Sequence, residues 1–339
     1  LSIKKGQQLW SLIEPFAAYG FNKAHAASYG RVAYQTAYMK ANFPVAYMTA
    51  ILSNESGDVE KISEIVLECK RMGIVILPPD VNYSEGGFSV ITNEDGKEEI
   101  RFGLYTIKNL GVDIADAIIA ERKKSGLFTS LENFISRITH KNLNKKSLEA
   151  LTMCGALDAF AERNQILANC ESILEYHKHV VKDNMLQNSL FDVAATSSFV
   201  MKKTTPATQK QKLTWEKELL GLFVSGFPLD PWKEKIIARN INIERVHSGG
   251  LTDKSDVSLA VIIEAVRITI TKKGDKMALL TLRDYEGFIE VAVFPETYKK
   301  YKDLIILDVP IVVKGKISTR NGEKTISVDE IRLLEAPTS

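Results

Sequence analysis

The sequence predicts a multidomain α + β protein, with a mostly helical region up to about residue 256 and a five-stranded β-barrel after it. Three observations support this class. The length of 339 residues favours two or more domains, because one hydrophobic core rarely organises so long a chain. Between residues 59 and 72, apolar residues recur at helical spacing. From about residue 257 the spacing changes to two, which is typical of strands.

Composition narrows the class of protein. Apolar residues make up 45% of the chain and charged residues 25%, as in ordinary soluble globular proteins. The net charge is only +2, so any nucleic-acid surface must be local. The sequence contains no signal peptide and no apolar run long enough to span a bilayer. Cys69, Cys154 and Cys170 lie far apart, which predicts buried, reduced thiols in a cytoplasmic protein.

The N-terminal elements are expected to be helices. One begins near Ala26 and is interrupted at Pro44, because proline lacks the N–H that a helix needs. A second covers residues 59–72, with Gly73 as its C-terminal cap. The sequence begins at Leu1 and not at methionine, so we expect a piece of a longer protein.

Extended chain follows, and then small helices. The prolines at 78 and 79 force an extended crossing. Two short strands are expected at residues 87–92 and 99–102, on either side of a turn at 93–96. In the region 103–175, Thr129 to Glu132 has the spacing of a capping box, and Asn144 is a good N-cap for a helix that Gly155 ends.

Residues 176–210 change in character. Lys, Asn, Ser and Thr become frequent, which predicts a linker. The histidines His177 and His179 are most simply part of a solvated helix face. A charged helix is expected at about 209–220, at the start of connecting helices that reach residue 256.

The C-terminal region alternates with period two. Predicted strands start near Val261 and continue in the runs 278–283, 288–294, 311–317 and 324–333. Hairpin turns are expected at 284–287 and 321–322, and a helix at 295–303 between the third and fourth strands. Five strands with a helix after the third are the order of an OB-fold barrel.

The segment from Tyr19 to Tyr29 contains the densest group of candidate ligand-binding side chains. Asn22, Lys23 and His25 follow a glycine and open a helix, where donors, a point charge and backbone N–H groups suit a triphosphate. The residues alone favour a plain loop with a capped helix, because short polar motifs recur by chance.

Two glycine-containing turns could hold a DNA backbone. The first, Ile107 to Gly111, precedes a predicted helix, and backbone N–H groups at such a turn grip phosphates without reading bases. The second lies within 148–163, around Gly155. An ordinary helical hairpin fits these residues equally well. The candidate contacts are Lys108, Asn109, Gly111, Lys145, Lys146, Gly155 and Arg163.

Two further surfaces are candidates for binding. Gln187, Leu190 and Phe191 lie in a polar region where a Leu-Phe pair has little core to join, so they could anchor in a partner's apolar pocket. On the barrel, cations around the first hairpin and an aromatic near the next suit single-stranded bases, although a solvated turn with core aromatics is the alternative. The barrel candidates are Arg267, Lys272, Lys273, Lys276 and Tyr285.

Several stretches, taken together and in order, resemble the alpha-subunit family of bacterial DNA polymerase III, the C-family replicative polymerases. They are YGFNKAHAASYGRVAYQTAYMKANFP (19–44), ECKRMGIVILPPDVN (68–82), IRFGLYTIKNLG (100–111), NLNKKSLEALTMCGALD (142–158) and LGLFVSGFPLD (220–230). The likeness covers nearly the whole chain, from the fingers through the OB-fold. At Asn109 the sequence departs from the family, which usually has glycine there. Asparagine tolerates positive φ better than other residues, which would allow the turn to form.

The resemblance implies a part of a DNA-directed DNA polymerase. It assigns the incoming nucleotide to Asn22, Lys23 and His25, duplex DNA to the hairpin turns, the beta sliding clamp to 187–191, and single-stranded template to the barrel. The Mg²⁺ ions belong to a palm domain N-terminal to this segment, since the sequence has no Asp-x-Asp pair, and the fragment alone is expected to be inactive. The implied domains are fingers 1–102, tandem helix-hairpin-helix 103–175, linker with clamp peptide 176–210, connecting helices 211–256, OB-fold 257–335 and tail 336–339.

Two rival functions remain. One is a non-catalytic DNA-binding adaptor built from hairpin and OB-fold modules, although an adaptor has no need of the cassette at 19–29. The other is the error-prone second alpha subunit, against which the clamp-like peptide argues. The family often has a further C-terminal domain that contacts the clamp-loader tau subunit, and this contact is in doubt because the sequence ends six residues after Leu333.

Overall fold

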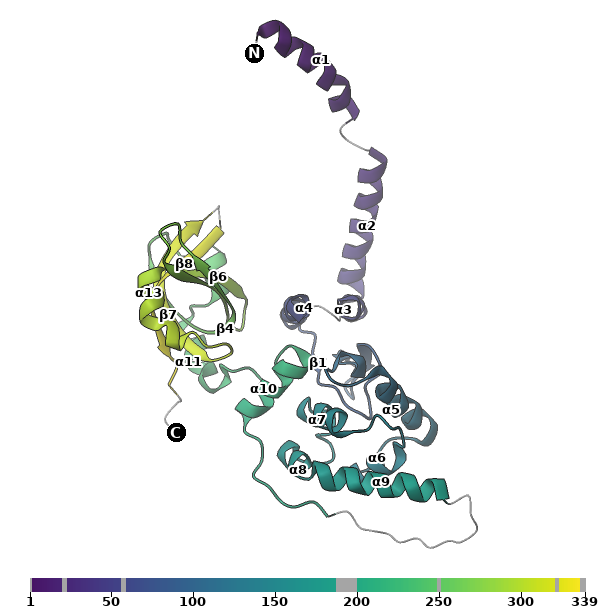
Figure 1. The fold of residues 1–339 in the computed structure, drawn as a ribbon. Coiled ribbons are helices and arrows are strands. Elements are labelled where there is room, and N and C mark those ends of the chain that lie inside the picture. The colour runs from purple at the N-terminus through teal and green to yellow at the C-terminus, as the bar shows by residue number, and fades with distance from the viewer. Residues whose placement is uncertain are drawn as a thin grey trace.

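The computed structural model describes residues 2–19, 23–55, 59–186, 200–248, 251–320 and 323–335. Figure 1 shows three parts: two N-terminal helices that extend away from the rest, a helical body, and a β-barrel beside it. The helical body comprises residues 44–55, 59–186 and 200–222, and one continuous hydrophobic core from Val45 to Leu222 holds it together. The barrel comprises residues 256–320 and 323–333 and has its own core.

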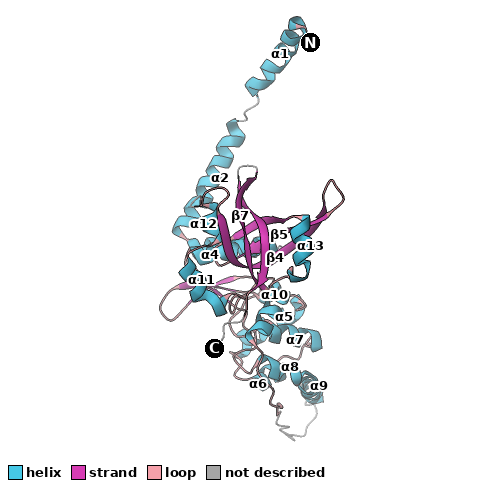
Figure 2. Cartoon of the chain, turned by 90° about the vertical axis from the view of Figure 1, so that its left-hand side faces the viewer, coloured by secondary structure: helices cyan, strands magenta, loops and turns pink. Residues whose placement is uncertain are grey.

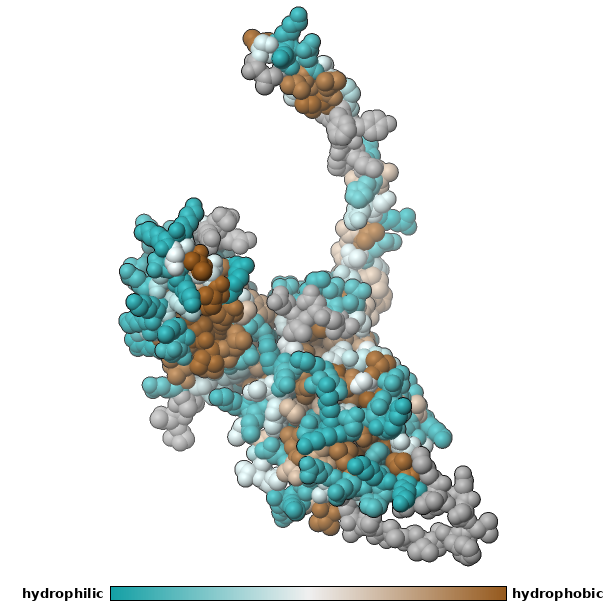
Figure 3. Space-filling view, viewed as in Figure 1, coloured by the Kyte–Doolittle hydropathy of each residue, from teal (hydrophilic) through white to brown (hydrophobic). Residues whose placement is uncertain are grey.

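The N-terminal helices are α1 (Ile3–Tyr19) and α2 (Lys23–Asn42). None of the α2 side chains in 23–42 is buried. Helix α3 (Pro44–Asn54) starts with Pro44 in its first turn, so the predicted interruption at this proline is confirmed. In the space-filling view, α1 carries hydrophobic side chains on a surface that no other described segment covers (Figure 3).

Helix α4 (Val59–Arg71) leads into a small sheet. Gly73 follows the helix at φ 74°, as the predicted C-terminal cap requires. The sheet has the strand order β1-β3-β2, with β1 parallel and β2 antiparallel to β3. Its strands are β1 (Ile76–Leu77), β2 (Ser89–Thr92) and β3 (Glu98–Arg101).

Five short helices complete most of the body: α5 (Val112–Ser125), α6 (Leu131–Arg137), α7 (Lys145–Met153), α8 (Arg163–Ala168) and α9 (Cys170–Leu186). Asn144 caps α7 in a capping box with Ser147, as predicted. The predicted box at Thr129 is wrong by one residue, because Ser130 is the N-cap and accepts from the Asn133 N–H.

The predicted linker 176–210 begins too early. Helix α9 continues to Leu186, so residues 176–186 are helical. His177 is also not on a solvated face. It is buried, with Nε2 2.8 Å from the carbonyl oxygen of Ile138. Helix α9 therefore packs on the body through His177. The run of polar residues from His177 to His179 did not indicate this contact.

The connection to the barrel contains α10 (Gln209–Leu220), η2 (Asp230–Trp232), α11 (Lys233–Arg239) and α12 (Ile243–His247), and the expected charged helix at 209–220 is confirmed. A small apolar cluster joins α10 to the barrel through Leu213, Phe223, Leu229 and Ile262. Lys217 of α10 also pairs with Glu264 of the barrel.

The barrel closes with the strand order β4-β5-β6-β8-β7. Figure 2 shows its strands beside α12 and α13. The strands and their inserted helix are β4 (Asp256–Ile270), β5 (Lys276–Arg283), β6 (Phe288–Val293), α13 (Pro295–Tyr301), β7 (Pro310–Arg320) and β8 (Glu323–Leu333). This is the predicted order, with the helix after the third strand. The turn 284–287 is confirmed by the bond from the Asp284 N–H to Gly287 O, whereas 321–322 lies outside the described residues.

The alternation in β4 fails after Ile263. Val261 and Ile263 are buried, but Ala265 is exposed, because a β-bulge shifts the register with β5 between Ile263 and Ala265. The bulge lets one 15-residue strand pair with β7 at its start and with β5 at its end.

The cysteines fit the prediction of buried thiols. Cys69, Cys154 and Cys170 are buried and free. Burial raises the pKa of the Cys69 and Cys154 thiols to about 12, so both stay protonated near neutral pH. Among the helices of the described ranges, none is both long and apolar enough for a transmembrane span.

Candidate nucleic-acid interface

The turn before α5 has the geometry of a phosphate-binding loop. Asn109 adopts φ 71°, the left-handed conformation in which asparagine replaces glycine at low cost. Gly111 is the N-cap of α5, and no side chain caps the first N–H groups of the helix. A Cβ at Gly111 would meet no atom within 4 Å, so the turn is open at this point. Lys108 is exposed, although its own N–H bonds to Leu219 O. The turn can therefore hold an anion through backbone groups and one lysine.

The second predicted hairpin needs a correction. Arg163 is only 2% exposed, and its guanidinium lies 3.0 Å from Glu216 and 2.8 Å from Asp158. Gly155 is buried at φ 89°, and a Cβ there would lie 2.5 Å from the Arg163 side chain. Neither residue can reach DNA. Arg163 instead ties α8 to α10 inside the body.

Two lysines of this hairpin remain available. Lys145 and Lys146 are exposed in the first turn of α7. Lys145 lies 3.7 Å from Glu171, but both side chains are exposed, so this ion pair is weak and a phosphate could displace it.

A groove of about 910 Å³ runs along the outer face of the barrel. It lies where β6 and β8 meet in parallel through a single residue pair, Ala292 and Ser327, which leaves the strands poorly joined. The groove has aromatic, cationic and hydroxyl side chains, and we call it the barrel groove. The residues used below are Arg267, Phe288, Phe294, Lys324 and Thr325.

The barrel groove combines ring faces with positive charge. Phe294 is 50% exposed, so much of its ring is open to solvent. Arg267 enters from β4 and Lys324 from β8. Such a surface can stack bases and neutralise a phosphate backbone at the same time.

Of the five barrel residues predicted from the sequence, Arg267 alone lines this groove. Lys272, Lys273 and Lys276 are exposed around the β4–β5 hairpin. The sequence reasoning missed Phe294 and Lys324. Their signal was the exposed side of the strand alternation, which only the barrel's curvature turns into a groove.

Tyr285, which is also predicted to contact single-stranded DNA, does not line the barrel groove. Its hydroxyl donates to Asp230 at 2.9 Å, and its ring lies between Lys70 and Lys233, 5.0 and 5.8 Å from the two ammonium groups. Burial, together with the bond to Asp230, raises the pKa of the Tyr285 phenol well above its ordinary value. Tyr285 therefore faces the junction between barrel and helical body.

The remaining predicted residues lie at or beyond the edge of the described structure. Lys23 is the first residue of α2, and the rings of His25 and Tyr29 pack at a tilt of 48° with centroids 4.3 Å apart. Asn22 lies outside the described residues, as do Gln187, Leu190 and Phe191 of the predicted clamp peptide. In the part of the chain that is described, no group of three or more His, Cys, Asp or Glu side chains could hold a metal ion. The described residues therefore do not fit a magnesium centre, and no step is assigned to one.

Comparison with known proteins identifies both modules. A helix-hairpin-helix motif model matches residues 73–166, which starts earlier than the predicted 103. An OB-fold nucleic acid binding domain model matches residues 257–334. The DNA polymerase III subunit alpha of Deinococcus radiodurans is 34% identical over 343 residues, which covers 98% of this chain and 25% of that protein.

The chain is homologous to part of the DNA polymerase III alpha subunit. The alpha subunit of Borreliella burgdorferi is 36% identical, with 97% of this chain and 29% of that protein covered. That of Escherichia coli O6:H1 is 32% identical, with 94% and 28% covered. The chain thus spans about a quarter of the length of these alpha subunits. The small single-stranded DNA-binding protein of Streptomyces coelicolor matches 26% of the chain at a TM-score of 0.21 and 13% identity, too low to carry an argument.

Proposed function

We propose that this chain is the nucleic-acid-holding portion of a bacterial replicative alpha subunit, and that it acts in template-directed DNA synthesis in the cytoplasm. The observation that carries the proposal is the pairing of two modules on a chain homologous to alpha subunits: an open hairpin turn at Gly111 and a barrel groove with an exposed Phe294. The first suits duplex DNA and the second suits single strands, which is what a polymerase needs on the two sides of a primer end. The full-length protein would use Mg²⁺ and deoxynucleoside triphosphates, with the metal held outside this segment.

The helical body is proposed to hold duplex DNA through its backbone. With Lys108, Lys145 and Lys146 replaced by alanine together, we expect weaker binding of a primer–template duplex to the 339-residue chain at every sequence. Each lost phosphate contact removes about 0.9 from the slope of log K against log salt, so the slope falls by about 2 to 3. Fluorescence anisotropy at several salt concentrations measures this.

The control replaces two other exposed lysines, Lys97 and Lys178, by alanine. It removes positive charge from other surfaces of the body and leaves the slope unchanged. A strong preference for one duplex sequence at fixed salt, or an equal slope for all three proteins, contradicts the assignment.

The clamp peptide is proposed from the sequence at Gln187, Leu190 and Phe191. Replacement of Leu190 and Phe191 by alanine is expected to weaken binding of the sliding clamp by about 30-fold or more, because two apolar anchors carry most of a small interface's energy. Titration of the clamp with wild-type and doubly substituted chains tests this. Equal affinities would remove the segment from the clamp interface. In the full-length polymerase, retained primer extension on short templates would show that the loss is specific to the clamp.

The incoming nucleotide is proposed to bind Lys23 and His25, with Asn22. In the full-length polymerase, Lys23→Ala is expected to raise KM for all four nucleotides by about tenfold to a hundredfold, the worth of a hydrogen bond to a charged group. The effect is equal for the four because a phosphate contact carries no base information. Steady-state kinetics with each nucleotide measure it, and unchanged KM and kcat would refute the assignment.

Two alternatives separate cleanly from this proposal. A non-catalytic adaptor would have no palm, so an upstream gene segment encoding paired aspartates excludes it. An error-prone alpha subunit would share the fold, and loss of clamp affinity on changing Leu190 and Phe191 argues against it. Other replisome subunits are proposed as partners of the full-length protein, and none of the residues assigned above is assigned to the clamp-loader tau subunit.

A further inference from the structure

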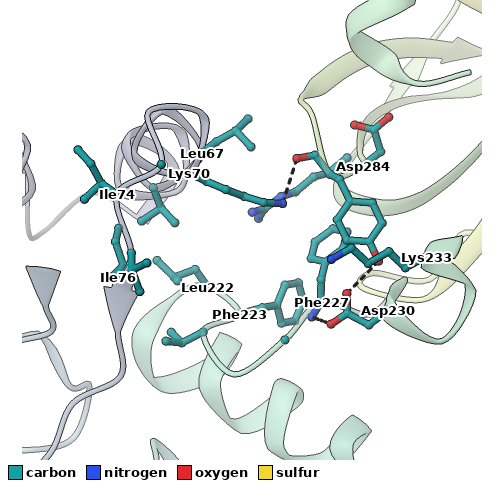
Figure 4. A pocket seen from close by; sticks show the side chains of 17 residues that line it. Leu67, Lys70, Ile74, Ile76, Leu222, Phe223, Phe227, Asp230, Lys233 and Asp284 are labelled. Atoms are coloured by element: carbon teal, nitrogen blue, oxygen red, sulfur yellow. Dashed lines mark hydrogen bonds between the residues drawn. The ribbon is translucent and has the colours of Figure 1, made fainter. Parts of the chain in front are cut away.

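A cavity of about 410 Å³ lies at the junction of the helical body and the barrel, and neither module's proposed role uses it. Figure 4 shows that its walls come from α4 and β1 on one side, the segment 222–227 below, and η2 and the β5–β6 turn on the other. We call it the junction cavity. Its volume falls in the range of small-ligand sites and suits a single mononucleotide.

Three cations converge on the junction cavity. Lys70 reaches across from α4, and Lys233 comes from the opposite wall (Figure 4). Among the described residues neither ammonium has a carboxylate within 4.0 Å, and the nearest polar contact of Lys70 is Tyr285 O at 3.5 Å. Arg283 contributes the third charge, and its side chain is 9% exposed.

The charge of Arg283 is poorly satisfied. Its only ion pair in the described structure is with Glu264 at 3.4 Å, and its buried Nε has no hydrogen-bond partner. Burying an N–H without an acceptor costs about 1–3 kcal/mol, so such groups usually face a ligand or water. A bound anion would supply the missing acceptor.

The acidic residues of the junction cavity do not supply an acceptor for the Arg283 Nε–H group. Asp230 accepts from the Tyr285 hydroxyl and from the Phe227 N–H at 2.6 Å. Asp284 accepts from the N–H groups of Ile243, Glu286 and Gly287. Both carboxylates are therefore occupied by N–H and O–H donors, and within the described ranges neither forms an ion pair with Lys70, Lys233 or Arg283. The three cations keep charge with which to attract a ligand's phosphate.

The rest of the lining is mostly apolar and includes three aromatic rings. Phe227 packs on Tyr285 with ring centroids 5.1 Å apart, and Phe223 lies against Phe227 at 5.8 Å. Aromatic faces accept nucleobases by stacking, and lysines act as point charges for phosphate. We propose that the junction cavity binds a nucleoside phosphate, with its phosphate between Lys70, Lys233 and Arg283 and its base against the aromatic wall.

Such a ligand would touch both parts of the chain at once. Lys70 belongs to the helical body and Arg283 to the barrel, so occupancy would fix the barrel against the body. The site is separate from the nucleotide contact proposed at Lys23. The nucleotide is either free in solution or the end of a bound strand, and the two sources share the same chemistry.

The test uses the 339-residue chain and dADP labelled with a mant fluorophore, displaced by unlabelled dADP. We expect saturable binding, and Lys70→Glu with Lys233→Glu weakens it by about tenfold or more, because both charged contacts are reversed. Both lysines are exposed, so the variant keeps its fold, which circular dichroism verifies. The control, Lys97→Glu with Lys178→Glu, makes the same change of charge elsewhere and leaves the affinity unchanged.

Competing ligands distinguish a free nucleotide from the end of a bound strand, and some of their outcomes would overturn the proposal. Displacement by a short oligothymidine supports a strand end, and failure to displace supports a free nucleotide. Inorganic phosphate that competes as well as dADP would show that the aromatic wall is not used and would overturn the assignment. So would absence of binding at millimolar dADP, or equal affinity in the charge-reversed variant. Binding of an oligonucleotide at the barrel groove is measured separately. Its loss would refute the role proposed for the barrel groove and would leave the result for the junction cavity unaffected.

Discussion

Replacement of Glu216 by alanine is expected to lower the free energy of unfolding of the helical body by about 3–5 kcal/mol, the usual cost of leaving a buried charge without its partner. Glu216 is fully buried and lies 3.0 Å from the Arg163 guanidinium. Its other oxygen accepts from the Val224 and Ser225 N–H groups at 3.0 and 2.9 Å. Loss of this carboxylate leaves the buried Arg163 guanidinium with Asp158 as its remaining ion-pair partner, and it leaves the Val224 and Ser225 N–H groups without their acceptor.

The measurement is urea unfolding followed by tryptophan fluorescence, for which Trp215 on the same helix is a local probe. Glu218→Ala is the matched control, because Glu218 is exposed on α10 and its loss is expected to change stability by no more than about 0.5 kcal/mol. The barrel has its own core, so its transition serves as an internal reference. Equal stability of the two variants would mean that Arg163 is satisfied without Glu216.

Replacement of Phe294 by alanine is expected to weaken binding of single-stranded DNA about 5- to 150-fold, since one base–aromatic stack is worth about 1–3 kcal/mol. The ring is half exposed in the barrel groove and has little packing to lose, so the fold survives the change. Anisotropy of a labelled oligothymidine with the 339-residue chain measures the affinity.

Phe43→Ala serves as the control, because Phe43 is 53% exposed at the start of α3, outside the barrel groove. Reversal of charge at Lys272 and Lys273 is expected to lower the salt dependence without removing the stack. If Phe294→Ala binds the oligothymidine as tightly as the wild type does, the barrel is a protein-docking module instead.

Local patterns accounted for the elements of this fold. Period-two alternation located the barrel strands, Pro44 and Gly73 located helix ends, and Asn144 located a cap, because each depends on near neighbours in the chain. The hairpin turn at Asn109 was also predictable, since one residue's tolerance of positive φ decides it. The bulge at Ala265 was not, because it depends on how one strand is shared between two partners.

By itself, the sequence determined the order of the modules and the chemistry available to each. Only the tertiary structure decided which charged and aromatic groups face solvent. Arg163 pairs with Asp158, five residues before it, but it is Glu216, 53 residues later, that ties it to α10 inside the body. Tyr285 turns toward Asp230 and away from the barrel groove, where Phe294 is exposed instead. The physical reason is that a side chain's availability depends on desolvation by distant segments, and spacing along the chain carries no record of those contacts.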